Sequence, residues 1–393
     1  MQPINKKRLP LKGIIGLSIG CADTYNLACG YCYANAGTYN NEKKQIMNMF
    51  GYSKLLDFIL ELEYPISTIT FFGGEPLLGF KYFKAFVEQL EKDYFLKYNL
   101  LPKLGIVTNG TLIDEEISIF FQKYFSAVSI SIDGPKHICD STRISVNAQE
   151  SVYDKIKSGL QLLNKTRNRE YNLMAISTLI PQTLREVKKI GYKDFQQHFL
   201  DLGFDNVSIF MASGVKWNSD DIEEIYILIE EIVDETFNTM IGGGTIKKLD
   251  SFVIGFISDI VHKHYNGDCV AGKNYFYYTV EGEFYPCQMY YMARRNEVKA
   301  IARYKIEECR QCVAINVCQG HCGGSSLIES GSENNPVKYH CLTQRKMLEY
   351  VVQRLGYYYF RKDISKEWSN IVESIINYSK ENARSKLIKS SVF

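Results

Sequence analysis

Short apolar runs alternate with longer amphipathic segments along the first half of this chain. The runs are rich in β-branched residues and nearly continuous in hydrophobicity, as is typical of parallel strands that are covered on both faces. They lie at residues 13–19, 68–72, 104–108, 128–132, 174–180 and 207–211. Helical patterns separate them at residues 54–62, 80–94, 115–125, 152–164 and 184–200. Six strand–helix units predict an α/β domain with a parallel sheet, either open or closed into a barrel.

The pattern changes after residue 212. A long acidic helix is predicted over 220–240, with Asn218 or Ser219 as its N-cap, and glycines at 242–244 end it before a second helix that runs to about residue 264. The chain from Cys269 onward is rich in turns and cysteine, with a thin apolar core that needs metal to stabilise it. A last helical stretch is predicted from about Leu342, interrupted near Gly356.

Composition excludes some classes of protein. The 393 residues carry a net charge of +2, which argues against a nucleic-acid partner that is held by phosphate contacts. No apolar region follows the basic N-terminal residues and no run approaches eighteen apolar residues, so neither a secretory signal nor a membrane span is predicted. We therefore expect a cytoplasmic protein whose thiols stay reduced and serve metal binding or catalysis.

Ten of the eleven cysteines fall into two blocks. The first block is Cys21, Cys29 and Cys32, and the second is Cys269, Cys287, Cys309, Cys312, Cys318, Cys322 and Cys341. Three thiolates on one loop can hold three irons of a 4Fe–4S cluster and leave the fourth iron open to a small molecule. The spacing alone leaves zinc open as an alternative for both blocks.

Turn motifs follow three of the predicted strands, at the edge where ligands bind in parallel α/β folds. Gly73-Gly74-Glu75-Pro76 follows the second strand, and Thr108-Asn109-Gly110 follows the third. The fourth strand ends in Ser131-Ile132-Asp133-Gly134-Pro135, with Arg143 eight residues further on. Paired glycines allow a ligand to approach the backbone closely. Each motif taken singly is also ordinary turn chemistry.

Four segments together make the chain resemble the radical S-adenosylmethionine (SAM) enzymes: YNLACGYCYA, TFFGGEPLL, VTNGTLI and SISIDGPKHICDSTR. The likeness covers roughly residues 12–350 and is closest to the branch with a C-terminal SPASM domain, which includes anaerobic sulfatase maturases and peptide maturases. It implies a partial (β/α)6 TIM-like barrel, followed by a small Cys-rich iron–sulfur domain and C-terminal helices. The implied domains are 1–213 (barrel), 214–264 (helical bridge), 265–345 (SPASM) and 346–393 (helical extension).

The resemblance also implies the cofactors, which are SAM and three 4Fe–4S clusters. Cys21, Cys29 and Cys32 would hold the SAM-binding cluster. The residues expected to contact SAM are Tyr31, Gly73, Gly74, Glu75, Asn109, Ser131, Asp133, Arg143 and Ser213. Among them, Glu75 and Arg143 have the charges that suit the ammonium and carboxylate of the methionine.

One position departs from the family pattern. The family spaces its cysteines as Cys-x3-Cys-x2-Cys, and here Tyr25 stands where the first cysteine is expected. We therefore predict that Cys21 is the third ligand, on a longer loop. The alternative is that Cys21 is a buried cysteine at the end of a strand and that the site is degenerate. Cys139 is expected to be a structural thiol.

The second block matches the SPASM pattern, which implies two auxiliary clusters. Cys309, Cys312, Cys318 and Cys341 would enclose one of them completely, and Cys269, Cys287 and Cys322 would hold the other. Sulfatase maturases add a fourth ligand where this chain has Lys263, so the second cluster is expected to keep an open iron that could bind a substrate thiolate. They also carry a basic Asp where this chain has Gln288, and an amide cannot accept that proton.

These departures favour a peptide maturase that forms thioether links in a cysteine-containing precursor peptide. An electron donor such as flavodoxin or ferredoxin is the expected partner. Because about a dozen residues precede the first strand, leader binding is expected to need either a separate leader-binding protein or a surface built from residues 220–264 or the C-terminal helices. The alternatives are oxidation of a sulfatase Ser or Cys to formylglycine, a degenerate peptide-binding scaffold and a structural zinc protein. No catalytic base is identified.

Overall fold

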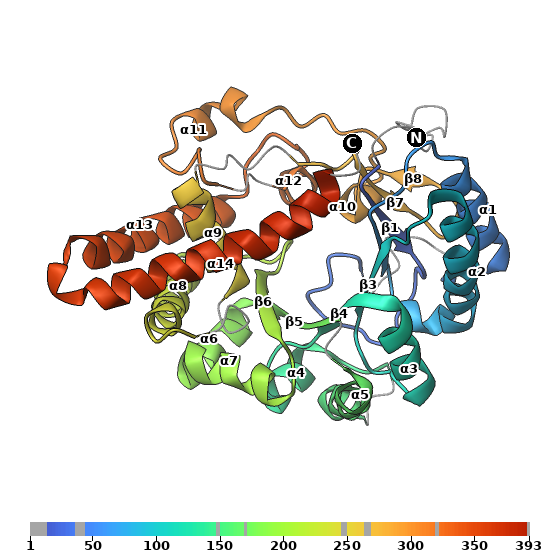
Figure 1. The fold of residues 1–393 in the computed structure, drawn as a ribbon, viewed down its shortest axis with the longest axis horizontal. Helices are drawn as coiled ribbons and strands as arrows, with labels where there is room; N and C mark the ends of the chain where they lie inside the picture. Colours follow the sequence, from blue (N-terminus) through green and yellow to red (C-terminus); the bar gives the residue numbers. More distant parts are fainter. Residues whose placement is uncertain are drawn as a thin grey trace. The chain divides into compact units, whose positions relative to one another are not determined.

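The computed structural model describes residues 14–35, 44–146, 150–168, 171–244, 250–262, 269–318 and 322–390. The chain divides into two compact units (Figure 1). The first comprises Met1–Thr178, Ala212–Gly214 and Val270–Lys299, and the second comprises Leu179–Met211, Val215–Cys269 and Ala300–Phe393. The four predicted domain limits stay a prediction, although residues 270–299, which we assigned to the Cys-rich domain, lie in the first unit.

A twisted, mainly parallel sheet forms the centre of the first unit. Its strands run in the order β5-β4-β3-β2-β1-β7-β8, and only β8 is antiparallel to its neighbour. The bounds are β1 Gly16–Gly20, β2 Thr68–Phe72, β3 Lys103–Thr108, β4 Phe125–Ser131, β5 Asn172–Leu179, β7 Tyr275–Tyr278 and β8 Phe284–Tyr285. This arrangement confirms the predicted α/β fold with a parallel sheet.

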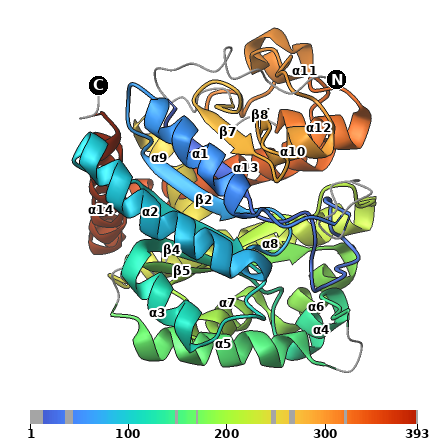
Figure 2. The same ribbon diagram turned by 90° about the vertical axis from the view of Figure 1, so that its right-hand side faces the viewer.

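Helices follow the strands of the first unit in the predicted alternation. They are α1 Met49–Glu61, the 3-10 turn η2 Pro76–Gly79, α2 Phe80–Tyr98, α3 Glu115–Tyr124, α4 Lys136–Thr142, α5 Val152–Thr166 and α10 Gln288–Met292. Figure 2 shows α1 and α2 side by side. Phe71 of β2 packs against Phe83 and Phe86 of α2, with ring centroids 5.0 and 6.2 Å apart, which fixes that helix on the sheet.

The second unit is mainly helical. Its elements are α6 Pro181–Ile190, α7 Tyr192–Asp201, β6 Asn206–Met211, α8 Ser219–Ile241, α9 Ser251–His262, η4 Arg303–Lys305, α11 Glu307–Arg310, α12 Gly323–Ser330, α13 Lys338–Phe360, η5 Lys362–Ile364 and α14 Ser365–Ser390. The helices α13 and α14 form an antiparallel hairpin that packs on α8 (Figure 1). Asp234 of α8 pairs with Arg354 of α13 at 2.8 Å.

Two sequence predictions were wrong in detail, and two strands were not predicted. The helix expected at 184–200 is two helices, because Gly191 adopts a φ of +83° and breaks the chain between α6 and α7. The helix α13 runs through Gly356 without interruption, and the break falls at residues 361–364. The strands β7 and β8 were not foreseen, since they lie in the cysteine-rich stretch.

Among the described helices, none is both long and apolar enough to cross a membrane.

Candidate functional site

The turn after β2 packs directly on the loop that follows β1. The Glu75 amide donates to the Thr24 carbonyl at 2.8 Å. A Cβ atom at Gly74 would lie 2.0 Å from that same oxygen, and Gly73 has a φ of +90°. Both glycines are therefore required by the close approach of two backbone segments.

Glu75 is completely buried and joins the turns after β2 and β3. Its Oε1 accepts hydrogen bonds from the Leu77 amide (2.9 Å) and the Thr108 hydroxyl (2.6 Å), and its Oε2 accepts one from the Asn109 amide (2.7 Å). Burial raises the pKa of Glu75 to about 7, against the opposing effect of these hydrogen bonds. The carboxylate thus organises the strand ends besides being a candidate partner for an ammonium group.

The cysteine loop is anchored to two neighbouring segments. The side-chain amide of Asn109 donates to Asn26 Oδ1, and Asn26 donates to the Thr111 hydroxyl, both at 2.8 Å. The backbone of residues 26–28 pairs with residues 144–146, with an Ala28 N to Ile144 O distance of 2.8 Å. These contacts hold the chain on the N-terminal side of Cys29 in one conformation.

Arg143 and Asp133 form a buried ion pair at 2.8 Å, with side chains that are 7% and 0% exposed. The Tyr31 and Thr142 hydroxyls both donate to Asp133 Oδ2 at 2.7 Å. The Nε of Arg143 is buried and has no hydrogen-bond partner among the described residues. A buried guanidinium with an unused donor fits the carboxylate of SAM.

Cys29 and Cys32 lie on one turn, in which the Cys32 amide donates to the Cys29 carbonyl at 3.1 Å. Burial raises the pKa of Cys29 to about 11, and the nearby Arg143 opposes this rise. Burial also raises the pKa of the Tyr25 hydroxyl, and the charges of Cys32 and Cys29 add to that rise.

Cys21 lies elsewhere, in the core at the end of β1. Its side chain is fully buried, and Sγ donates to the Ile19 carbonyl at 3.5 Å. Burial raises the pKa of this thiol to about 12, with the Tyr52 hydroxyl opposing the rise. The structure shows Cys21 as a buried thiol at the end of β1, and its role as the third ligand stays a prediction.

Ser131 and Ser213 are partly buried, at the end of β4 and in the Ala212–Gly214 segment of the first unit. Cys139 is fully buried on α4, and burial raises its pKa to about 12. The SAM contacts predicted for both serines stay predictions.

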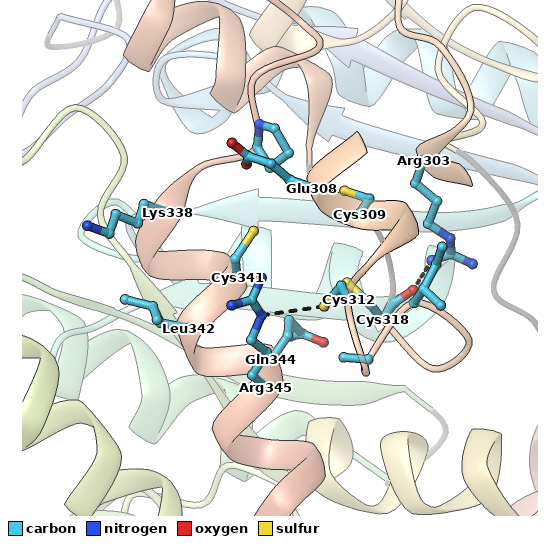
Figure 3. A pocket seen from close by; sticks show the side chains of 13 residues that line it. Arg303, Glu308, Cys309, Cys312, Cys318, Lys338, Cys341, Leu342, Gln344 and Arg345 are labelled. Carbon is cyan, nitrogen blue, oxygen red and sulfur yellow. Dashed lines mark hydrogen bonds between the residues drawn. The ribbon is translucent and has the colours of Figure 1, made fainter. Parts of the chain in front are cut away.

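Four cysteines of the second block surround one cavity of about 400 Å³ (Figure 3). Cys309 lies on α11, Cys341 on α13, and Cys312 and Cys318 on the turns between them. Burial and the neighbouring thiols raise the pKa of Cys341 to about 11. The cavity is far larger than a single zinc ion with Zn–S bonds of about 2.3 Å, so its thiols and volume fit a polynuclear iron–sulfur cluster. No group of three or more His, Cys, Asp or Glu within the described ranges could hold one metal ion.

Two arginines border this cavity. Arg345 Nε donates to Cys312 Sγ at 3.4 Å, and Arg303 donates to the Cys318 carbonyl (Figure 3). Positive charge beside thiolates offsets the net negative charge of a thiolate-ligated cluster. The pocket thus has both the ligands and the supporting charges that such a cluster needs.

The remaining three cysteines belong to different units. Cys287 precedes α10 in the first unit, whereas Cys269 and Cys322 lie in the second, where Cys322 Sγ accepts from the Ser325 amide at 3.4 Å. Their sharing of one cluster stays a prediction, and Lys263 lies outside the described residues. The Oε1 of Gln288 is buried without a hydrogen-bond partner in the part of the chain that the structure describes.

Sequence reasoning missed a carboxylate–phenol cluster near α10. The Tyr291 hydroxyl donates to Asp23 Oδ2 at 2.7 Å and lies 3.2 Å from Glu281 Oε2. Asp23 is fully buried. The two partners are 268 residues apart, and neither stands in a recognisable motif, so no sequence signal could have joined them.

Comparisons with known proteins agree with this geometry. Residues 24–191 match the family described as the radical SAM superfamily. The chain is 25% identical over 370 residues to the cysteine-type anaerobic sulfatase-maturating enzyme of Clostridium perfringens (strain 13 / Type A), covering 86% of this chain and 95% of that protein. These matches confirm the predicted resemblance to radical SAM enzymes and to anaerobic sulfatase maturases, while the SPASM domain stays a prediction.

Two solved structures share the fold. Native anSMEcpe with bound AdoMet and Cp18Cys peptide is similar at a TM-score of 0.67 and 21% identity, covering 87% of this chain and 98% of that chain. Streptococcus suis SuiB bound to precursor peptide SuiA is similar at a TM-score of 0.53 and 16% identity, covering 83% and 75%. At these identities the likeness establishes the fold.

Proposed function

Because residues 24–191 match the radical SAM superfamily, we propose that this protein modifies a cysteine-containing precursor peptide by joining a cysteine sulfur to a carbon atom. SAM and three 4Fe–4S clusters are the proposed cofactors, and flavodoxin or ferredoxin is the proposed electron donor. Two proteins of the same fold, anSMEcpe and SuiB, were each solved with a bound peptide, which supports a peptide substrate. A separate leader-binding protein is part of the proposal.

The observation that carries the thioether assignment is Gln288. It begins α10 directly after Cys287, where the family resemblance places a carboxylate base. Its Oε1 lies buried without a partner among the described atoms, so the position is shielded from water as a base would be. An amide cannot take up the proton that formylglycine formation releases at this point. Bond formation to a metal-held thiolate would need no base there, because coordination to the cluster would remove the thiol proton.

The residues of the proposed SAM site act mainly by holding SAM in position. Arg143 offers its free Nε to the methionine carboxylate, while Asp133 holds the guanidinium and Tyr31 in place. The backbone at Gly74 and the Glu75 carboxylate define the corner for the ammonium group. When bound, SAM and the clusters supply a carbon-centred radical and an acceptor for one electron.

Co-expression with short cysteine-rich open reading frames, followed by mass spectrometry, tests the proposal. We expect a modified peptide that has lost two hydrogens per crosslink and retains all its sulfur. A peptide that has lost sulfur and gained an aldehyde would instead indicate formylglycine formation. Unmodified peptide, together with the absence of 5′-deoxyadenosine after incubation with SAM and dithionite, would contradict the proposal and favour a degenerate scaffold.

Formylglycine formation is the second candidate function. It is favoured by the similarity to a sulfatase-maturating enzyme over 86% of this chain. It is also favoured by Asp23, whose carboxylate contacts Tyr291 on the same helix as Gln288 and could replace the missing base. An Asp23→Asn variant separates the two candidates, since only formylglycine formation requires this carboxylate as a proton acceptor.

A further inference from the structure

The chain segment that carries Cys309 and Cys312 has two sides. Residues 301–313 form consecutive hydrogen-bonded turns, in which the Ile306 amide donates to the Arg303 carbonyl and the Cys312 amide donates to the Cys309 carbonyl, each at 3.0 Å. Arg303, Cys309 and Cys312 line the cavity of about 400 Å³ (Figure 3). Other residues of the segment are exposed to solvent. The turns that form the cavity wall therefore also carry a surface.

Three large apolar side chains of this segment are exposed. Ile301, Tyr304 and Val313 are 44%, 61% and 77% exposed. An apolar side chain that is exposed singly is ordinary, but several on one short segment indicate a surface that another protein covers. Tyrosine is also among the residues that contribute most to binding when an interface buries them. The apolar part of this surface thus suits a protein partner.

Positive charge is concentrated on and beside the same segment. The segment and the cavity lining together contain two acidic residues, Glu307 and Glu308, and five basic ones, Arg303, Lys305, Arg310, Lys338 and Arg345. Lys305 and Arg310 are exposed and do not line the cavity. The whole chain of 393 residues has a net charge of only +2, so much of its excess positive charge lies here. Charge complementarity therefore favours a partner with an acidic docking face.

The cavity indicates which acidic partner this is. Its four cysteines fit an iron–sulfur cluster, and the exposed turns lie on the cavity wall. Proteins that exchange electrons associate briefly, through interfaces of less than about 1,200 Å², and complementary charge speeds their encounter. We propose that the exposed face of residues 301–313 is the docking surface of a small acidic electron carrier. This inference rests on the proposed function, because it assumes that the cavity holds a cluster.

The proposed reaction gives such a carrier an electron to collect. Each crosslink removes two hydrogens from the peptide. One leaves as a hydrogen atom and is incorporated into 5′-deoxyadenosine, and the other leaves as a proton, which goes to solvent, and an electron. The docked carrier, in its oxidised form, is reduced by that one electron.

Binding of a flavodoxin with a net negative charge to the full, anaerobically reconstituted chain tests the inference. A variant that combines Lys305→Glu with Arg310→Glu reverses two exposed charges and leaves every residue of the cavity lining unchanged. We expect its dissociation constant for flavodoxin to rise about tenfold at low ionic strength. We also expect its binding to depend less on salt concentration than that of the wild type. Calorimetric titration at two salt concentrations measures both effects.

The apolar part of the surface is tested by Val313→Ala. We expect this variant to bind flavodoxin about threefold more weakly, because two buried methyl groups are lost from the interface. The matched control is Val352→Ala on α13, which truncates another exposed valine of the second unit. The matched control for charge combines Lys189→Glu with Lys193→Glu, two exposed lysines on α6 and α7 of that unit. Both controls should bind as the wild type does.

Equal weakening by the two charge-reversal variants would overturn the inference, because flavodoxin would then respond to overall charge alone. Unchanged flavodoxin binding in the Lys305, Arg310 variant would also overturn it. If the same variant binds the co-expressed cysteine-rich peptide more weakly, the surface serves the peptide instead.

These results leave the proposed function standing, because dithionite needs no protein carrier. Every variant, like the wild type, should keep its iron content and form 5′-deoxyadenosine with dithionite, which also shows that it is folded. Wild-type protein that forms no 5′-deoxyadenosine with dithionite would overturn the proposed function, and this inference with it.

Discussion

The two cysteine sites are built in opposite ways. Around Cys29 and Cys32, the ends of four parallel strands and a network of buried hydrogen bonds define the loop before any metal binds. Around Cys309 and Cys341, short turns and the start of α13 surround a cavity of about 400 Å³, and four of the thirteen residues that line it are cysteines. The first site is organised by the fold, whereas we expect the second to need a bound metal to organise it.

This difference predicts where each site is vulnerable. A site fixed by the sheet loses function when a positioning residue changes, but the unit remains folded. A site fixed by its metal loses local structure when any ligand changes. Four measurements can separate these behaviours.

The largest effect is expected for Cys341→Ala. Structural metal sites contribute on the order of 10 kcal/mol to folding, so loss of one ligand should remove about four irons and destabilise the second unit. Iron content and thermal unfolding followed by circular dichroism measure this. The control is Cys139→Ala, which removes a buried thiol outside the C-terminal pocket. Equal melting temperatures for the two variants would show that the C-terminal pocket does not depend on metal.

Arg143→Gln should have the next largest effect. It leaves the fully buried Asp133 without its ion-pair partner, which costs about 3–5 kcal/mol. We expect urea unfolding to show this loss, together with the loss of SAM binding by calorimetry. Lys136→Gln is the matched control, because the exposed Lys136–Asp154 pair should be worth less than about 1 kcal/mol. If the Arg143→Gln variant binds SAM as tightly as the wild type, Arg143 does not contribute to SAM binding.

A third test uses the pH dependence of Glu75. Its pKa of about 7 in the folded protein exceeds its ordinary value of 4.5, so the native state binds more protons than the unfolded state in this range. Stability should therefore fall by about 3 kcal/mol as pH rises from 4.5 past 7. The difference in unfolding free energy between wild type and Glu75→Gln, measured at several pH values, isolates this contribution. If the unfolding free energies of the wild type and of Glu75→Gln change with pH in parallel, Glu75 does not contribute to the pH dependence of stability.

The smallest effect on stability is expected for Arg345→Gln. Arg345 is mostly exposed, so removal of its contact with Cys312 should cost less than about 1 kcal/mol. Loss of a positive charge and a hydrogen bond at a cluster sulfur should nevertheless lower the reduction potential of that cluster. A redox titration followed by electron paramagnetic resonance measures the shift. An unchanged potential would mean that Arg345 does not contact a ligand of the cluster.

The sequence predicted the strands well because the short apolar, β-branched runs that indicate them are a local property of the sequence. The run at 68–72 coincides with β2, and the predicted cap Asn218 accepts a hydrogen bond from the Asp221 amide at the start of α8. Side chains that depend on tertiary contacts were harder to place. Cys21 was predicted from spacing, which cannot show that strand pairing buries its thiol. The Asp23–Tyr291 contact joins residues that only the folded sheet brings together.

The strand β7 has a consequence for how this protein can be divided. It pairs with β1 from Gly16↔Tyr275 to Ile19↔Tyr278 and covers an edge that would otherwise be open. A truncated chain that ends near residue 213 would expose the backbone of β1, and uncovered strand edges promote aggregation. A chimera that exchanges the cysteine-rich region for that of a relative must therefore retain residues 275–285. The part of the protein that can be exchanged is therefore not a contiguous stretch of sequence.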